Sequence, residues 1–175
     1  MGHSEPSALP EDVKIRISEV ASAAVKALGI ANGPSHTEIK VTKDGPKIVE
    51  LGARLGGDNI TTHLVPLSTD VDMVECCIKI ALGEEPDMAK KCEFGSAIRY
   101  FKTDKGIITN ISGLEDAKRL EGVIQVSIVH GIGEKVSEIK NSIDRAGFVI
   151  AQGKSAADAV EICENALRKI EFEVD

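Results

Sequence analysis

The stretch HTEIKVTKDGPKIVELG, residues 36–52, decides the fold that we expect for the first half of this chain. Two runs of alternating apolar and polar residues flank DGP at 44–46, which has strong turn chemistry. The sequence therefore predicts an antiparallel β-hairpin. The apolar residues that we expect on its core face are Ile39, Val41, Val49 and Leu51. Since side chains alternate along a strand, this arrangement requires a loop of odd length, such as residues 44–46.

That register brings two acidic residues together. With Lys43 opposite Lys47, Glu50 lies opposite Lys40. Glu38 then lies diagonally from Glu50 on the non-core face, at about 7–8 Å between Cα atoms. Mg²⁺ prefers hard oxygen ligands and takes one or two protein carboxylates together with phosphate and water. We therefore consider Glu38 and Glu50 a candidate metal site; the alternative is a solvated strand face on which Glu50 pairs with Lys40.

The segment that follows the hairpin, ARLGGDN, predicts a glycine-rich bend next to these acids. Arg54 could bring a guanidinium to a phosphate or carboxylate. Gly56 and Gly57 would let the backbone approach a ligand closely. Two weaker signals are interpreted as structural. The histidines at 36, 63 and 130 are scattered without metal-ligand spacing, and GIGEK at 131–135 is expected to be a loop.

The rest of the chain predicts helices before residue 90 and strands after it. Apolar stripes and end signals predict helices over 10–28 and 70–82. A charged connector with a proline, EEPDMAKKC at 84–92, separates them from short β-type runs. These runs are GSAIRYFKT, KGIITNISG, GVIQVSIV and AGFVIAQG, followed by a helix capped by Ser155 and an edge strand in EFEVD. The expected class is α+β, divided near residue 90.

Composition excludes several classes of protein. The net charge of −7 and the aromatic content of 3% disfavour nucleic-acid binding, which needs clustered cations and stacking rings. No apolar stretch approaches the roughly 20 residues that a membrane-spanning helix needs, and the N-terminal residues show no secretory signal. Four cysteines without a metal spacing are expected to be reduced thiols in a cytoplasmic protein.

The string HTEIKVTKDGPKIVELGARLGGDN resembles the metal-binding hairpin of ATP-grasp enzymes. It is most similar to carboxylate–amine ligases that include L-amino acid ligases, and more distantly to biotin carboxylase and carbamoyl-phosphate synthetase. The resemblance implies that Glu38 and Glu50 bind the Mg²⁺ (or Mn²⁺) that bridges the ATP phosphates. It also implies that Arg54 steadies an acyl phosphate or substrate. In the E-x-N-x-R motif of the family, Gly52 stands where Asn is common.

The resemblance also implies an organisation. Residues 1–90 would be the C-terminal part of an ATP-grasp domain, an antiparallel sheet with flanking helices. Residues 91–175 would be the small β-rich α+β domain that follows it in amino-acid ligases. The expected function is that of a fragment of an ATP- and Mg²⁺-dependent ligase, which joins a small carboxylate to an amine through an acyl phosphate.

The half of the family fold that grips ATP has no obvious match among the 37 residues before Glu38. We therefore expect the isolated chain to be inactive and to need an N-terminal portion or a partner subunit. Homo-oligomerisation and the roles of Asp58 and Asn59 stay open. The alternatives are a fragment of a carbamoyl-phosphate synthetase or biotin carboxylase relative, or a non-catalytic assembly module.

Overall fold

The computed structural model describes all 175 residues, which divide into two compact units. Residues Ala8–Thr62 and Val71–Ala89 form the first, here called the hairpin unit. Met1–Ser7, His63–Asp70 and Lys90–Asp175 form the second, here called the sheet unit. Each unit is described by itself. No helix of the chain combines the length and apolar character that crossing a membrane requires.

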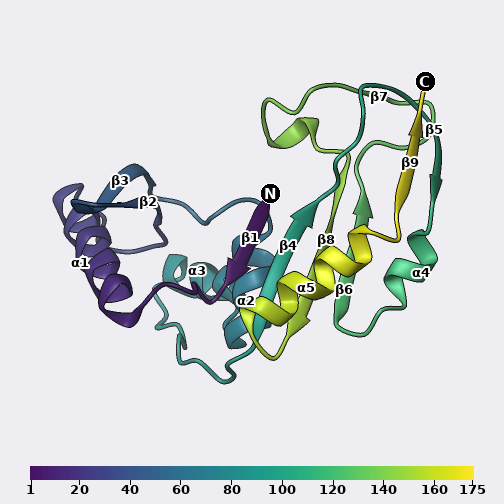
Figure 1. Cartoon of the computed structure of the whole chain (residues 1–175). Helices are drawn as coiled ribbons and strands as arrows, with labels where there is room; N and C mark the ends of the chain where they lie inside the picture. Colours follow the sequence, from purple (N-terminus) through teal and green to yellow (C-terminus); the bar gives the residue numbers. More distant parts are fainter. The chain divides into compact units, whose positions relative to one another are not determined.

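The hairpin unit contains the two helices and the hairpin that the sequence predicts. Its elements are α1 (Glu11–Ala27), β2 (His36–Thr42), β3 (Gly45–Gly52) and α3 (Met73–Ala81). Helix α1 lies alongside the hairpin and contacts both strands (Figure 1). It ends before Gly29, whose φ of 69° suits a left-handed residue after a helix. Helix α3 is capped by Asp72, whose side chain accepts hydrogen bonds from the backbone N–H groups of Val74 and Glu75.

The register of the hairpin differs from the expected one. The turn contains two residues, with Thr42 paired to Gly45, so the predicted loop over 44–46 is wrong. Lys40 lies opposite Lys47 rather than Glu50. The Thr42 hydroxyl donates to the Gly45 carbonyl at 2.9 Å and accepts from the Asp44 N–H at 3.2 Å. These local bonds favour the shorter turn, and the proline at position 46 is tolerated because both strands of a two-stranded sheet are edges.

A β-bulge restores the arrangement of the acidic residues. From the turn as far as the Ile39–Ile48 pair, the pairing of the strands is the one that a two-residue turn sets. Beyond that pair the register shifts by one residue, so that Glu38 pairs with Glu50. Val49 is the extra residue. Without this extra residue, Glu50 would lie opposite Thr37 and point to the other face. The predicted sharing of one face by Glu38 and Glu50 is confirmed, although a bulge produces it instead of an odd loop.

The opposite face of the hairpin is not the buried core that we expected. Val41, Ile48 and Val49 are 41%, 44% and 63% exposed. No residue of α1 is fully buried. The hairpin unit therefore has little enclosed apolar interior of its own.

The sheet unit is built on two antiparallel sheets. The four-stranded sheet has the order β1 (Gly2–Glu5), β4 (Gly95–Tyr100), β8 (Gly147–Gly153), β6 (Val123–Ile128). The three-stranded sheet has the order β7 (Lys135–Val136), β5 (Gly106–Ser112), β9 (Glu171–Val174). The helices of this unit are α2 (Val65–Thr69), α4 (Leu114–Lys118) and α5 (Ala156–Leu167). Short helical turns occur at Ile60–Leu64 and Ser142–Asp144.

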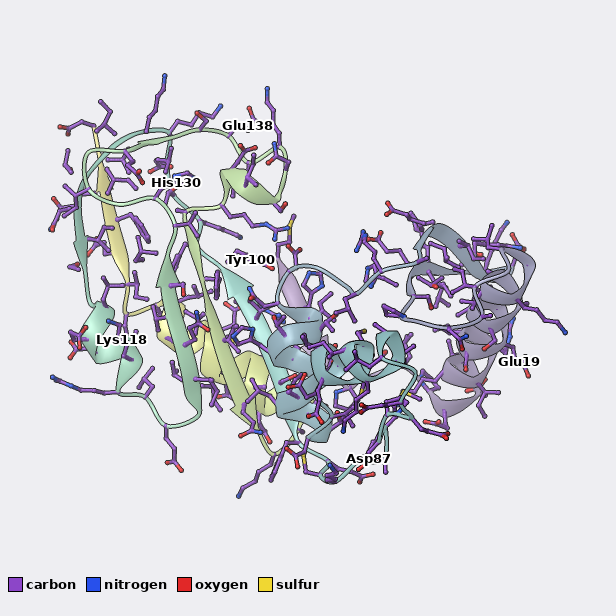
Figure 2. The ribbon with its side chains drawn as sticks, turned by 180° about the vertical axis from the view of Figure 1, so that it is seen from behind. Glu19, Asp87, Tyr100, Lys118, His130 and Glu138 are labelled. Atoms are coloured by element: carbon purple, nitrogen blue, oxygen red, sulfur yellow. The ribbon has the colours of Figure 1, made fainter.

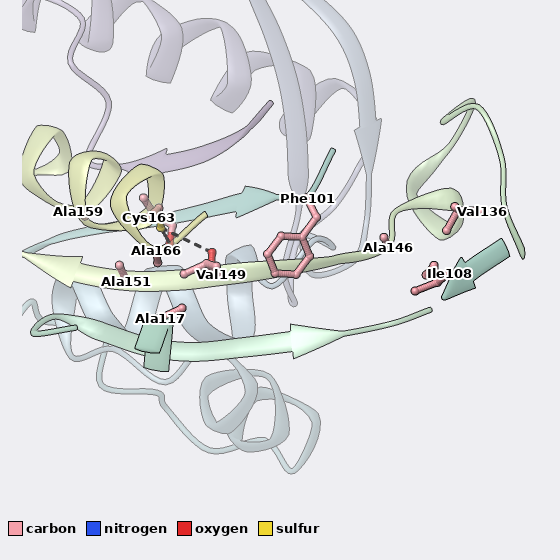
Figure 3. Close-up of a cluster of buried hydrophobic side chains, with 11 residues drawn as sticks. Phe101, Ile108, Ala117, Val136, Ala146, Val149, Ala151, Ala159, Cys163 and Ala166 are labelled. Atoms are coloured by element: carbon pink, nitrogen blue, oxygen red, sulfur yellow. Dashed lines mark hydrogen bonds between the residues drawn. The ribbon is translucent and has the colours of Figure 1, made fainter. Parts of the chain in front are cut away.

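Helix α5 packs across β4 and β8 and encloses the main core (Figure 1). The buried residues of this core are Ala97, Phe101, Ile108, Ala117, Val136, Ala146, Val149, Ala151, Ala159, Cys163 and Ala166. Small residues on the helix let it approach the sheet closely. Cys163 donates to the carbonyl oxygen of Val149, 3.6 Å from sulfur (Figure 3), and to that of Ala97 at 3.5 Å. Burial raises the pKa of this thiol to about 12.

The aromatic residues are few, but two of their contacts connect separate segments of the sheet unit. Phe101 and Phe172 lie with ring centroids 5.2 Å apart, which joins the end of β4 to β9. The Arg145 guanidinium lies 3.8 Å from the centroid of Tyr100, a cation–π contact between the β4 end and the segment before β8.

Candidate metal-binding site

Glu38 and Glu50 are direct cross-strand partners at the bulge of the hairpin. Residues directly opposite each other in an antiparallel pair share a face, with Cβ atoms about 4.5–5.5 Å apart. Their side chains are 53% and 59% exposed, so both carboxylates are open to a ligand from solvent. The structure thus makes Glu38 and Glu50 direct cross-strand partners, whereas the sequence predicted a diagonal arrangement.

Arg54 joins the same cluster from the bend after β3. Its Nη2 lies 3.4 Å from Glu50 Oε1, and its Nη1 donates to the Leu55 carbonyl oxygen at 2.9 Å. A Cβ at Gly52 would come within 3.3 Å of the Arg54 side chain, so the glycine leaves the arginine room. The guanidinium is 55% exposed and has further N–H donors for an oxyanion.

His36, which we expected to be an ordinary structural residue, also lies beside this cluster. Its Nε2 lies 3.7 Å from Glu38 Oε1. The two residues are separated by one position on β2 and therefore face the same side. The H-x-E spacing on a strand is the signal that could have identified this contact.

The other histidines do not converge on the cluster. His130 lies in the sheet unit, where its Nδ1 is 3.7 Å from Glu134 Oε2 and its Nε2 is 3.3 Å from the Ile143 carbonyl oxygen. His63 also falls in the sheet unit. The predicted GIGEK loop is confirmed up to Lys135, where β7 begins.

Asp58 and Asn59 shape the bend after Arg54. Both have positive φ angles, 52° and 60°, a left-handed conformation that Asp and Asn tolerate better than most residues. These two residues reverse the chain within the glycine-rich stretch.

The donor set fits a hard cation that brings other ligands with it. No group of three or more His, Cys, Asp or Glu side chains in the chain is arranged to hold a metal ion. A pair of carboxylates suits Mg²⁺, which commonly keeps water and substrate phosphate oxygens as its remaining ligands. The residues that would hold such an ion are Glu38 and Glu50.

Comparisons with known proteins agree with this fold. The chain superimposes on the crystal structure of an L-amino acid ligase from Bacillus licheniformis with a TM-score of 0.87, at 24% identity, over 99% of this chain and 44% of that one. The fold is therefore that of the C-terminal part of an ATP-grasp enzyme, with antiparallel sheets and flanking helices.

Sequence comparisons extend this result. Residues 99–175 match the family described as L-amino acid ligase C-terminal domain 2. The L-arginine-specific L-amino acid ligase of Bacillus subtilis is 26% identical over 135 residues, which are 75% of this chain and 32% of that protein. An uncharacterised protein of Sinorhizobium fredii is 29% identical over 170 residues, 97% of this chain and 35% of that protein.

These matches show that the chain is similar in sequence and fold to the C-terminal part of ATP-grasp carboxylate–amine ligases. The chain spans about a third of the length of these curated relatives. The resemblance that the hairpin motif indicated is thus confirmed.

Proposed function

We propose that this chain supplies the metal-binding hairpin and the small C-terminal domain of an ATP- and Mg²⁺-dependent ligase that joins a carboxylate to an amine. The observation that carries this proposal is the direct pairing of Glu38 with Glu50 beside Arg54. The similarity to carboxylate–amine ligases supports the reaction class. Residues 1–90 would complete the ATP-grasp domain, and residues 91–175 would form the domain that follows it.

The proposed reaction proceeds through an acyl phosphate. A carboxylate oxygen attacks the γ-phosphorus of ATP and ADP leaves; the amine nitrogen then attacks the acyl carbon, phosphate leaves, and the nitrogen loses a proton. The two hairpin carboxylates hold Mg²⁺ or Mn²⁺, which offsets the negative charge on the transferring phosphoryl group. Arg54 orients the acyl phosphate through a charge-assisted contact. This chemistry needs no protein nucleophile.

The proposal includes partners beyond this chain. ATP would lie between this chain and a second, ATP-gripping half, present in the same polypeptide or in a partner subunit. The substrates would be a small carboxylate and a small amine. Such a ligase would work in the cytoplasm, where ATP and Mg²⁺ are supplied.

Isotope transfer tests the reaction class. A ligase that contains this chain together with an ATP-gripping half is first screened with carboxylates for ADP release. It is then given ATP, an amine and an ¹⁸O-labelled carboxylate. Because the bridging oxygen of an acyl phosphate comes from the carboxylate, the released phosphate should carry one ¹⁸O atom. Label recovered in AMP instead would indicate an acyl adenylate and contradict the proposal.

A further inference from the structure

Each acid of the hairpin pair has a nitrogen-bearing partner of its own. Glu50 has Arg54, at 3.4 Å. Glu38 has His36, at 3.7 Å from Nε2 to Oε1. Two like charges placed directly opposite each other destabilise a sheet. Arg54 therefore offsets part of the repulsion that the Glu38–Glu50 pairing creates, and His36 can offset a further part through an N–H on Nε2.

The glycine-rich bend lies against the His36 ring. A Cβ at Gly56 would lie 2.9 Å from His36 Nδ1, closer than side-chain carbons normally come. Gly56 is held in turn by Thr61, whose hydroxyl donates to its carbonyl oxygen at 2.9 Å. The His36 side chain is only 23% exposed, against 53% for Glu38. The imidazole thus has less freedom than the carboxylate that it faces.

We propose that His36 is a positioning residue, which orients the Glu38 carboxylate for the metal ion. An N–H on Nε2 would place its positive end toward Oε1 across the 3.7 Å that separates the two atoms in the structure. Groups that hold metal-ligating side chains in this way set ligand orientation and metal affinity. The inference rests on the proposed metal site and adds to it the residue that aims one of its two ligands.

The alternative is that the ring only fills space against Gly56. Two substitutions separate these roles. His36→Leu keeps an apolar side chain of similar bulk but removes the donor. His36→Gln keeps an N–H donor at a similar distance from the backbone. The chain also offers a matched control, because His130 lies at the same 3.7 Å from a glutamate, Glu134, in the sheet unit (Figure 2).

The test uses the 175-residue chain itself, with Mg²⁺ alone as the probe. Mg²⁺ is titrated at fixed pH while the backbone amide shifts of β2 and β3 are followed by NMR. Cross-strand contacts in the same spectra report whether the hairpin is intact. We expect His36→Leu to weaken Mg²⁺ affinity about tenfold, at the low end of the effect of removing such orienting partners. His36→Gln should retain most of the affinity, and His130→Leu should leave it unchanged.

Other outcomes would overturn the inference. Equal affinity in the His36→Leu and His130→Leu variants would show that His36 does not orient the ligand. Equal losses in His36→Leu and His36→Gln would assign the effect to ring packing. Glu38→Gln and Glu50→Gln locate the failure: if both abolish the Mg²⁺-dependent shifts but His36→Leu does not change them, only the role of His36 is wrong. If the parent chain shows no Mg²⁺-dependent shift at the hairpin, the metal site itself is wrong.

Discussion

Glu50 lies opposite Glu38 on the neighbouring strand and 3.4 Å from the Arg54 guanidinium. The two contacts have different effects on stability. An exposed Arg54–Glu50 pair contributes little to stability. A directly opposed Glu38 costs a fraction of a kcal/mol, on the order of the 0.2–1 kcal/mol typical of cross-strand pairs. The pairing of the two acids therefore brings no net gain in stability of its own, which supports the proposed cation site.

The first prediction concerns the charge of Glu50 in a ligase that contains this chain. Glu50→Gln preserves shape but removes one charge from the metal, so turnover at saturating Mg²⁺ and ATP should fall. Losing one comparable electrostatic contact costs about 10²–10³ in rate. Glu75→Gln is the matched control, since Glu75 is 60% exposed, against 59% for Glu50, and pairs only with Lys79 on α3. Equal, near-parental turnover of the two variants would show that the hairpin is only a scaffold.

The second prediction concerns the thiols. Burial raises the pKa of Cys163 to about 12, and the thiolate is the reactive form. At pH 8, iodoacetamide should therefore label the half-buried Cys92 and leave Cys163 unmodified until the chain is unfolded. Mass spectrometry of the digested chain measures both. Labelling of Cys163 as fast as Cys92 in the native chain would contradict the packing of α5 on β4 and β8.

At the scale of elements, the sequence predicted the hairpin, the long helices and most strands of the sheet unit. Periodicity sufficed there because each element has a regular apolar pattern and a clear end signal. The predicted α5 begins at its Ser155 cap, whose hydroxyl accepts from the Asp158 N–H at 3.2 Å. The edge strand predicted in EFEVD is β9, which pairs only with β5.

The elements that the sequence did not predict lack such patterns. β1 is a polar strand, GHSE, which is ordered by pairing with β4 about 95 residues away. α2 and α4 have five residues each, too few for a periodic signal. The bulge at Val49 has no sequence signature either, yet it decides which face Glu50 occupies. The sequence could predict that the two acids share one face of the hairpin. It could not predict whether an odd loop or a bulge produces this arrangement, because that depends on turn and bulge energetics.

The third prediction tests the burial of β1. Burial raises the pKa of the Glu5 carboxyl from 4.5 to about 7. Between these values the unfolded chain releases a proton that the folded chain retains, so the free energy of unfolding falls as pH rises from about 4.5 to about 7. Glu5→Gln removes this loss. The free energy of unfolding of the variant minus that of the parent should therefore be larger at pH 8 than at pH 4, by on the order of 1–3 kcal/mol. Denaturant unfolding at both values measures the difference; parallel pH curves would show that Glu5 is solvated.

At the scale of the whole chain, the two units differ in how much interior they enclose. The cluster of fully buried apolar residues lies in the sheet unit, around α5, β4 and β8. The hairpin unit exposes the apolar side chains of Val41 and Ile48 on one face and carries the acidic pair on the other, with the exposed Val49 at the bulge. The unit that carries the proposed chemistry is therefore the one with less apolar packing of its own.

The fourth prediction follows from the small donor set. Without ATP, two carboxylates leave most of the Mg²⁺ octahedron to water, so the chain should bind Mg²⁺ weakly, with a dissociation constant well above the micromolar range. Isothermal titration calorimetry measures this affinity. Micromolar binding would mean that further ligands join the pair, and Asp58 and Asn59 in the bend after Arg54 would be examined first.

The last prediction concerns activity of the chain alone. ATP has to be held along its whole length for phosphoryl transfer, because positioning and charge stabilisation supply nearly all of the catalysis. The hairpin cluster offers two metal-binding carboxylates and one guanidinium for the phosphates, and the chain spans about a third of the curated relatives. Purified as 175 residues, it should therefore neither release ADP from ATP nor form amide bonds with mixtures of amino acids. A coupled ADP assay with and without Mg²⁺ measures this, with Glu50→Gln as the background control. Metal-dependent ADP release that disappears in the Glu50→Gln variant would show that this chain alone can position ATP for phosphoryl transfer.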